Sequence, residues 1–266
     1  MRAAWRGIIT PFMKRLLLDL STGFPTLTFI GGTALAEFYL GHRYSEDLDF
    51  ASPSLAAIDH LEGPLEALLK GKGLSLSVSF PIRGAVVVYV KDPDSGDSVK
   101  IEFSTNPHIV ESEVLVIDGV RIPSAEHLAD LKWRAFPRQK IKDVFDLASL
   151  RAAGVAQPWP PAVTFAAPAL AAAQRMLAGW AASLPEKPGW FPGTDARWEE
   201  KVGEMTTFLE EFSNEAVRYL TAHNRVADQT GTASGAARDS RRQRLPRSPR
   251  QGVPGSNPKK REGNIS

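Results

Sequence analysis

The sequence contains no cysteine among its 266 residues. Disulfides and thiolate metal ligands are therefore excluded, and any bound metal must be held by oxygen or imidazole ligands. No apolar run approaches the roughly 18 residues of a membrane-spanning helix, so we expect no membrane partner. The N-terminus has basic residues but lacks an apolar core followed by a small-residue cleavage site, which predicts a cytoplasmic protein.

The composition is that of an ordinary globular protein, with 43% hydrophobic and 23% charged residues. The length is sufficient for one large domain or two modest ones. The character of the sequence changes near residues 154 and 224. We therefore predict a head domain (residues 1–154), a helical C-terminal region (155–223) and a disordered basic tail (224–266).

The predicted tail carries ten Lys or Arg against three Asp or Glu, a net charge of +7, whereas the rest of the chain carries −5. It is rich in Gly, Pro, Ser and Arg and has little to bury, which predicts disorder. A basic tail can attract nucleic acid through the phosphate charges. The alternatives are a solvated terminus without a function and a chain end created by frameshift or cloning.

Short strands and helices alternate irregularly in the head. Strands are expected at residues 25–30, 47–52 and three times between 74 and 105, and a hairpin is expected around Asp118-Gly119. Two helices should flank Pro137, and two more should cover residues 168–183 and 195–223. Because regular helices do not separate the strands, the pattern predicts an α+β (mixed α/β) fold with a mixed sheet.

Two aspartates one residue apart raise the question of a metal. On a strand, Asp47 and Asp49 share one face while Leu48 and Phe50 point to the other. Such pairs are common on solvated surfaces, but apolar flanks make a bare two-charge patch hard to explain unless a cation covers it. We therefore predict Mg²⁺, or Mn²⁺, held by oxygen ligands.

A third carboxylate would complete that site. Glu102 lies on a predicted strand between apolar Ile101 and Phe103, so it should face away from the core. We assign it as a metal ligand, and the alternative is a solvent-facing strand residue.

A glycine turn precedes the acidic strand. Gly31, Gly32 and Thr33 offer backbone N–H groups, a hydroxyl and a helix N-terminus, a combination that suits phosphate. A lone Gly-Gly-Thr is common in ordinary turns. Beside Asp47 and Asp49, it predicts a phosphate site next to a metal site.

Charged residues also gather around Pro137. Lys132 lies on the helix before it, and Asp143 and Asp146 are three residues apart on the helix after it, hence on one face. An ordinary surface charge pattern is the alternative. Because the strand motifs are also present, we interpret these three charged residues as part of the predicted metal and phosphate site.

Four motifs in this order, GGTALA, HRYSEDLDF, VKIEF and LKWRAFPRQKIKDVFDLASL, resemble the AbiEii/AbiGii-type toxin nucleotidyltransferases of the DNA polymerase beta-like superfamily. The resemblance spans about residues 25–150. The superfamily commonly has Gly-Ser where this chain has Gly32-Thr33, which keeps the hydroxyl. The resemblance implies NTP phosphate contacts from Gly31, Gly32 and Thr33, metal binding by Asp47 and Asp49, and further site residues Lys132, Arg138, Lys140, Asp143 and Asp146. To the nucleotide-binding set we add Arg43 and Ser45.

The expected reaction transfers NMP from an NTP to an acceptor hydroxyl and releases pyrophosphate, with Lys132 and an arginine offsetting phosphate charge. The resemblance suggests RNA as acceptor, including the 3′ end of tRNA, and a cognate antitoxin as partner. Two alternatives remain. One is a small-molecule nucleotidyltransferase of the antibiotic-modifying kind, and the other is a non-catalytic nucleotide-binding protein of the same fold.

Overall fold

The computed structural model describes residues 1–155 and 163–235. The chain divides into two compact units, Met1–Ala222 and His223–Ser266. The account below concerns the first unit, and the described part of the second is the end of the last helix. None of the described helices has the length and apolar character needed to cross a membrane.

A five-stranded sheet with the order β1-β2-β5-β4-β3 forms the centre of the first unit. Only β2 and β5 run parallel, and the other neighbours pair antiparallel. The predicted α+β fold with a mixed sheet is therefore confirmed. The strands are β1 (Thr28–Ile30), β2 (Asp47–Ser52), β3 (Ser75–Ile82), β4 (Ala85–Lys91) and β5 (Ser98–Thr105).

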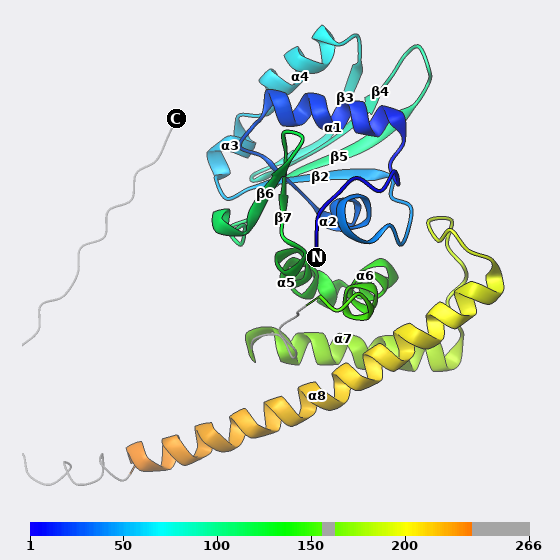
Figure 1. The fold of residues 1–266 in the computed structure, drawn as a ribbon. Helices are drawn as coiled ribbons and strands as arrows, with labels where there is room; N and C mark the ends of the chain where they lie inside the picture. The colour runs from blue at the N-terminus through cyan, green and yellow to red at the C-terminus, as the bar shows by residue number, and fades with distance from the viewer. Residues whose placement is uncertain (156–162, 236–266) are drawn as a thin grey trace, which may run out of the picture. The chain divides into compact units, whose positions relative to one another are not determined.

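One face of the sheet is apolar because the strand sequences alternate. Leu48, Phe50 and Phe103 are fully buried or nearly so, and the two phenylalanine rings stack 5.5 Å apart across the parallel pair. Helix α1 (Pro11–Gly23) crosses the sheet (Figure 1) and contributes its buried side to the same hydrophobic cluster. Two shorter helices, α3 (Leu55–Asp59) and α4 (Glu62–Gly71), also belong to this part of the chain.

The glycine turn begins α2 (Gly31–Leu35), which continues as a π-helix, η1 (Ala36–Leu40). Gly41 ends it in the left-handed conformation, with φ of 63°. Glu37, buried in the π-helix, accepts four backbone N–H groups from residues 6–9 at 2.6–2.9 Å. The N-terminal segment is thereby fixed to the helix that follows the glycine turn.

The predicted hairpin consists of β6 (Val114–Ile117) and β7 (Val120–Pro123), preceded by a short 3₁₀ turn, η2 (Glu111–Glu113). Its turn residues Asp118 and Gly119 both have positive φ, 49° and 82°. This is the turn geometry that matches the twist of a two-residue hairpin, so the prediction is confirmed.

Two helices cover the acidic side of the sheet. Ser124 caps α5 (Ala125–Ala135) by accepting the N–H of His127. The chain then passes through the 3₁₀ turn η3 (Phe136–Arg138) and left-handed Gln139 into α6 (Ile141–Ala152). This sharp connection, at the predicted Pro137 break, makes α5 and α6 neighbours.

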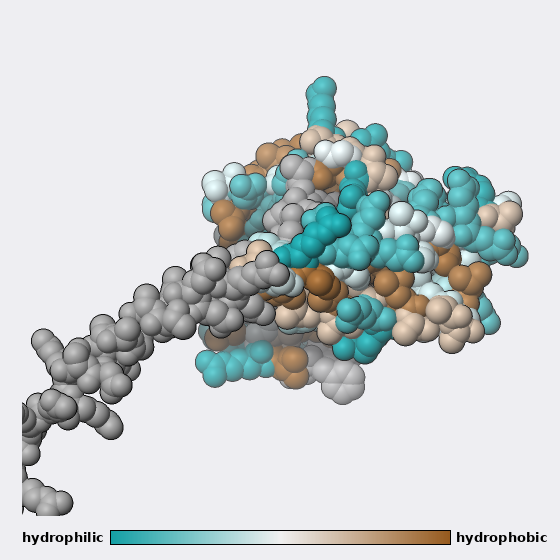
Figure 2. Space-filling model, turned by 90° about the horizontal axis from the view of Figure 1, so that it is seen from below, coloured by the Kyte–Doolittle hydropathy of each residue, from teal (hydrophilic) through white to brown (hydrophobic). Residues whose placement is uncertain are grey.

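Helices α7 (Val163–Ala182) and α8 (Asp195–Gly235) form a further layer, so that α5 and α6 lie between the sheet and this pair (Figure 1). Trp133 of α5 contacts the rings of Phe208 and Phe212 of α8. The buried cluster therefore includes residues on both sides of position 154, and the predicted domain boundary there stays a prediction. Seen from the α7 and α8 side, hydrophilic and hydrophobic residues are interspersed (Figure 2).

Both C-terminal helices are longer than predicted. Helix α7 begins at Val163 and contains Pro168, because the alanine-rich flanks favour a helix strongly. Helix α8 runs to Gly235, 12 residues beyond its predicted end at residue 223, and no proline interrupts it there. The disorder of the tail stays a prediction. The remainder of the predicted tail, 236–266, lies outside the described residues.

Candidate active site

A cavity of about 320 Å³ lies between the acidic face of the sheet, the glycine turn and the α5–η3–α6 segment. Every residue that the sequence assigned to the site lines it, with the exception of Asp146. Those lining residues are Gly31, Gly32, Thr33, Arg43, Ser45, Asp47, Asp49, Glu102, Lys132, Arg138, Lys140 and Asp143.

Acidic side chains form one wall. Asp49 is directly opposite Glu102, and Asp47 is opposite Lys100, in the parallel pairing of β2 with β5. Burial, followed by the charges of Glu102 and Asp47, raises the pKa of Asp49 to about 6, although Lys132 and Lys100 act in the other direction. The surroundings of Asp49 therefore disfavour its charged form, despite the two nearby lysines.

This donor set fits a hard divalent cation. Within residues 1–155 and 163–235, no three acidic or imidazole groups are arranged as a complete protein-only metal cluster. Magnesium does not need one, because it is held by one or two carboxylates and completes its shell with water and substrate phosphates. Asp47 and Asp49 supply such carboxylates, and Glu102 lies beside them on the same face, with Lys100 Nζ at 3.5 Å from its carboxylate.

The glycines of the turn are needed for close approach. Gly31 has φ of 80°, and a Cβ there would collide with the Asp49 carboxylate. A Cβ on Gly32 would collide with the guanidinium of Arg43. The backbone of the turn therefore lies against the acidic wall on one side and a buried cation on the other.

A chain of hydroxyls joins the turn to the acidic strand. The Thr33 hydroxyl donates to the carbonyl oxygen of Asp47 at 2.6 Å. Since Thr33 has one proton and that carbonyl can only accept, the Ser45 hydroxyl donates to Thr33. Arg43 Nη1 in turn lies 3.4 Å from Ser45 Oγ. Thr33 thus holds the backbone of Asp47, and its contact with a nucleotide phosphate stays a prediction.

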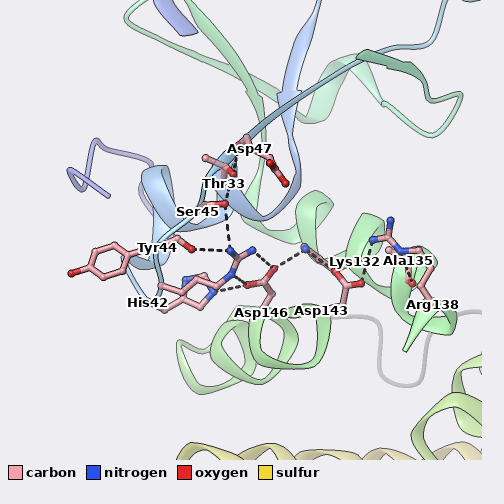
Figure 3. A network of polar contacts seen from close by, with 11 residues as sticks. Thr33, His42, Tyr44, Ser45, Asp47, Lys132, Ala135, Arg138, Asp143 and Asp146 are labelled. Atoms are coloured by element: carbon pink, nitrogen blue, oxygen red, sulfur yellow. Dashed lines mark hydrogen bonds and ion pairs between the residues drawn. The ribbon is translucent and has the colours of Figure 1, made fainter. Parts of the chain in front are cut away.

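The opposite wall is built on a buried charge network (Figure 3). Lys132 Nζ lies 2.9 Å from Asp143 Oδ1 and 2.6 Å from Asp146 Oδ2. Arg43 contacts the same Asp146 carboxylate twice, through Nε at 2.7 Å and Nη2 at 3.0 Å. All four side chains are buried. Burial opposes the charged forms, but Asp146 and Asp143 outweigh it and raise the pKa of Lys132, while Lys132 and Arg43 hold the pKa of Asp146 well below its ordinary value.

Asp146 is fully buried beneath this network and does not line the cavity. Its Oδ1 also lies 2.7 Å from Nε2 of His42. It therefore contacts three basic side chains and no open space. We expect it to position Lys132 and Arg43, so the catalytic role given to Asp146 by the sequence remains a prediction in this narrower form.

Exposed cations form the rim. Arg138 Nη2 lies 3.2 Å from Asp143 Oδ2, and its Nε donates to the Ala135 carbonyl. Lys140 is exposed, and Lys142 also lines the cavity. The rim is therefore positive where the acidic wall is negative.

These walls bring together the four sequence motifs named above. A family model described as the nucleotidyl transferase AbiEii toxin of a type IV toxin–antitoxin system matches residues 12–225. The chain belongs to the AbiEii family. No curated protein matches it.

Solved structures agree with the AbiEii fold. JHP933 from Helicobacter pylori is 21% identical with a TM-score of 0.53, and the match covers 81% of this chain and 94% of that one. A second Helicobacter pylori protein, described as a candidate nucleotidyltransferase, is 17% identical with a TM-score of 0.50, and the match covers 78% and 94% of the two chains. At this identity the likeness shows the fold alone.

As an AbiEii protein, the chain is a nucleotidyltransferase toxin, with an NTP substrate and an antitoxin partner implied by its family.

The structure adds neighbours that the sequence analysis of the site missed. Trp190 lies with its ring 5.9 Å from the Arg43 guanidinium and 6.0 Å from Lys142 Nζ. Its carbonyl accepts the N–H of Tyr44 at 3.0 Å. No sequence pattern links Trp190, between α7 and α8, to the loop before β2. Only the HRYSEDLDF motif, which includes that loop, indicated that this region belongs to the site.

Proposed function

We propose that this AbiEii protein transfers a nucleoside monophosphate from an NTP to a hydroxyl of RNA in a reaction that depends on a divalent metal ion. The observation that carries the proposal is the pairing of two walls in one cavity. Asp47, Asp49 and Glu102 lie on one side, and Lys132 with the cationic rim lies on the other. This charge pattern suits a metal-bound triphosphate, because carboxylates bind the metal ion and cations bind the phosphates.

The acidic wall supplies the metal site. Asp47 and Asp49 would hold Mg²⁺ or Mn²⁺, with Glu102 as the third oxygen ligand. When bound, the ion neutralises phosphate charge and polarises the phosphorus for attack. Burial, followed by the charges of Glu102 and Asp47, raises the pKa of Asp49, and a bound cation would favour the charged form, which supports this assignment.

The chain's own residues bind the nucleotide and stabilise the leaving group. Backbone N–H groups of Gly31 and Gly32 face the triphosphate, and Arg138, Lys140 and Lys142 offset its negative charge at the rim. Lys132, held by Asp143 and Asp146, remains charged at neutral pH and fixed in place. Fixed charge of this kind costs little reorganisation when charge develops in the transition state.

The bond changes balance simply. The acceptor oxygen forms a bond to the α-phosphorus, the bond from that phosphorus to the bridging oxygen of the β-phosphate breaks, and pyrophosphate leaves. The hydroxyl proton is released. We favour RNA over a small molecule as the acceptor because the rim carries the exposed cations Arg138 and Lys140 beside half-buried Lys142, and such cations suit a polyanion.

The test is transfer of label from each α-³²P NTP to total RNA, purified tRNA and a panel of small hydroxyl compounds, with Mg²⁺, Mn²⁺ or EDTA. Label on RNA should require metal, and Asp49→Asn should lower the rate at least about 10³-fold. Asp94→Asn, an exposed aspartate in the β4–β5 turn, is the matched control and should retain the wild-type rate. Label on a small molecule but not on RNA would overturn the acceptor assignment, and undiminished transfer by Asp49→Asn would overturn the metal site.

A further inference from the structure

A second cavity, of about 280 Å³, lies on the other side of the Arg43–Asp146 pair. Its walls come from the loop after η1, from α6, from the segment before α8 and from the first turns of α8. The residues that matter for its chemistry are His42, Phe145, Ser149, Phe191, Arg197 and Lys201.

The charge of this cavity is one-sided. Arg197 and Lys201 line it, and among its described lining residues none is acidic. Lys201 is paired with Glu204 at 2.6 Å, so its charge is already partly used. The side chain of Arg197 is exposed, and within the described part of the chain no ion pair to its guanidinium is found. Arg197 is therefore the available cation.

The helix geometry adds to this positive charge. Thr194 begins α8 by accepting the N–H of Arg197 through its hydroxyl and that of Trp198 through its carbonyl. Arg197 thus lies in the first turn, where the helix dipole favours an anion. Asp195 of the same turn is paired with Lys187 at 3.6 Å and does not line the cavity. Ser149 contributes a hydroxyl from the opposite wall.

The two cavities are separated by one layer of side chains. His42 lines the second cavity, and its Nε2 lies 2.7 Å from Asp146 Oδ1. The same oxygen accepts Arg43 Nε at 2.7 Å, and Arg43 lines the first cavity. Close by, the N–H of Tyr44 donates to the carbonyl of Trp190, which bonds the loop before β2 to the segment before α8.

We propose that the second cavity binds a backbone phosphate of the RNA acceptor, with Arg197 as its main ligand. This inference rests on the proposed function. In the proposed function the triphosphate lies in the first cavity, between the acidic wall and the rim of Arg138, Lys140 and Lys142, so a separate positive cavity suits a further phosphate of a polymer. Phe145 and Phe191 also line the cavity and give it apolar surface that the sugar of that nucleotide can contact.

The test compares wild type, Arg197→Ala, Arg197→Lys and the control Arg218→Ala. Arg218 is a 75% exposed arginine on the same helix, is paired with Glu215 and lies outside the cavity. Binding of the labelled RNA substrate is measured by anisotropy at several salt concentrations, and transfer kinetics are measured with RNA and NTP varied in turn.

Arg197→Ala should weaken RNA binding about three- to tenfold and lower the slope of log K against log salt by about one. The KM for RNA should rise while the KM for NTP and the kcat stay at wild-type values. Arg197→Lys should recover most of the RNA affinity, and Arg218→Ala should match the wild type.

Unchanged RNA affinity and salt slope in Arg197→Ala would overturn the inference. A rise in the KM for NTP instead would reassign the cavity to the nucleotide and also overturn it. Failure of the proposed function is distinguishable, because the wild-type enzyme itself would then not label RNA.

Discussion

Lys132 Nζ lies 2.6 Å from Oδ2 of Asp146, and both side chains are buried. Breaking such a pair leaves an uncompensated charge inside the protein. Lys132→Met should therefore lower the free energy of unfolding by about 3–5 kcal/mol, measured by urea denaturation. Lys72→Met is the control, because Lys72 pairs with Asp19 at the surface and should contribute about 1 kcal/mol or less.

The double variant Lys132→Met, Asp146→Asn should lose less than the sum of the two single variants, because the second change removes the stranded carboxylate. The double variant should regain stability but not transfer activity, because it still lacks the charge of Lys132. Additive losses would contradict a direct interaction between the two groups.

The same carboxylate gives the protein a specific sensitivity to acid. Since the folded pKa of Asp146 is well below the ordinary 3.8, its contribution to stability is complete above about pH 4 and is lost as the pH falls through the folded value. Urea denaturation between pH 6 and pH 2 should show Asp146→Asn losing less stability with acid than the wild type. Parallel curves for the two proteins would contradict this account.

Substitution of the glycine turn separates backbone strain from collision. Gly31 and Gly96 have similar φ values, 80° and 77°, but a Cβ meets the Asp49 carboxylate at Gly31 and open space at Gly96. Gly96→Ala should cost only about 1–2 kcal/mol of conformational strain and keep activity. Gly31→Ala should lose more stability and nearly all transfer, as measured by denaturation and by the labelling assay. Equal effects at both positions would show that the Asp49 contact is unimportant.

The burial of Asp49, together with the charges of Glu102 and Asp47, should be visible in the free energy of unfolding. A pKa raised to about 6 corresponds to about 3 kcal/mol of unfavourable interaction of the charged form. In EDTA at pH 7, Asp49→Asn should therefore be more stable than the wild type, by up to this amount. Mg²⁺ should raise the melting temperature of the wild type and of Asp94→Asn, but not that of Asp49→Asn. Equal stabilisation of all three by Mg²⁺ would place the metal elsewhere.

The N-terminal segment depends on one buried carboxylate. Glu37→Gln replaces one acceptor oxygen by a donor that faces backbone N–H groups, so two of the four hydrogen bonds are lost. We expect a loss of about 3 kcal/mol and faster amide exchange at residues 6–9. Glu66→Gln, on the exposed side of α4, should change neither quantity. Slow exchange at residues 6–9 in Glu37→Gln would show that other contacts hold the segment.

Much of the fold could be predicted because it follows from short-range preferences. Alternation in DLDFAS placed Asp47 and Asp49 on one face and Leu48 and Phe50 in the core, and the structure confirms it. The Asp118-Gly119 turn was predicted from residue type alone. The ends of α7 and α8 were not, since packing and the absence of nearby breakers decide where a helix stops.

The site was predictable in its members but not in their contacts. The sequence analysis grouped Asp143 and Asp146 with Lys132 on the basis of helical spacing. Spacing does not show how deeply a side chain is buried. In the structure, Asp146 is fully buried and only Asp143 lines the cavity. The assignment of Arg43 to the nucleotide stays a prediction, and sequence analysis gave no sign of the bond between Arg43 and Asp146, 103 positions away. Trp190 and Arg197 carried no local signal.

The sequence by itself determined which elements form, which strand face is acidic and which residue types are available for phosphoryl chemistry. Each of these depends on the backbone and side-chain preferences of adjacent residues. Only the tertiary structure decided which charges meet, because the energy of an ion pair depends on distance and burial, and both are set by packing of segments far apart in the chain. That packing placed a carboxylate wall and a cationic wall around one cavity.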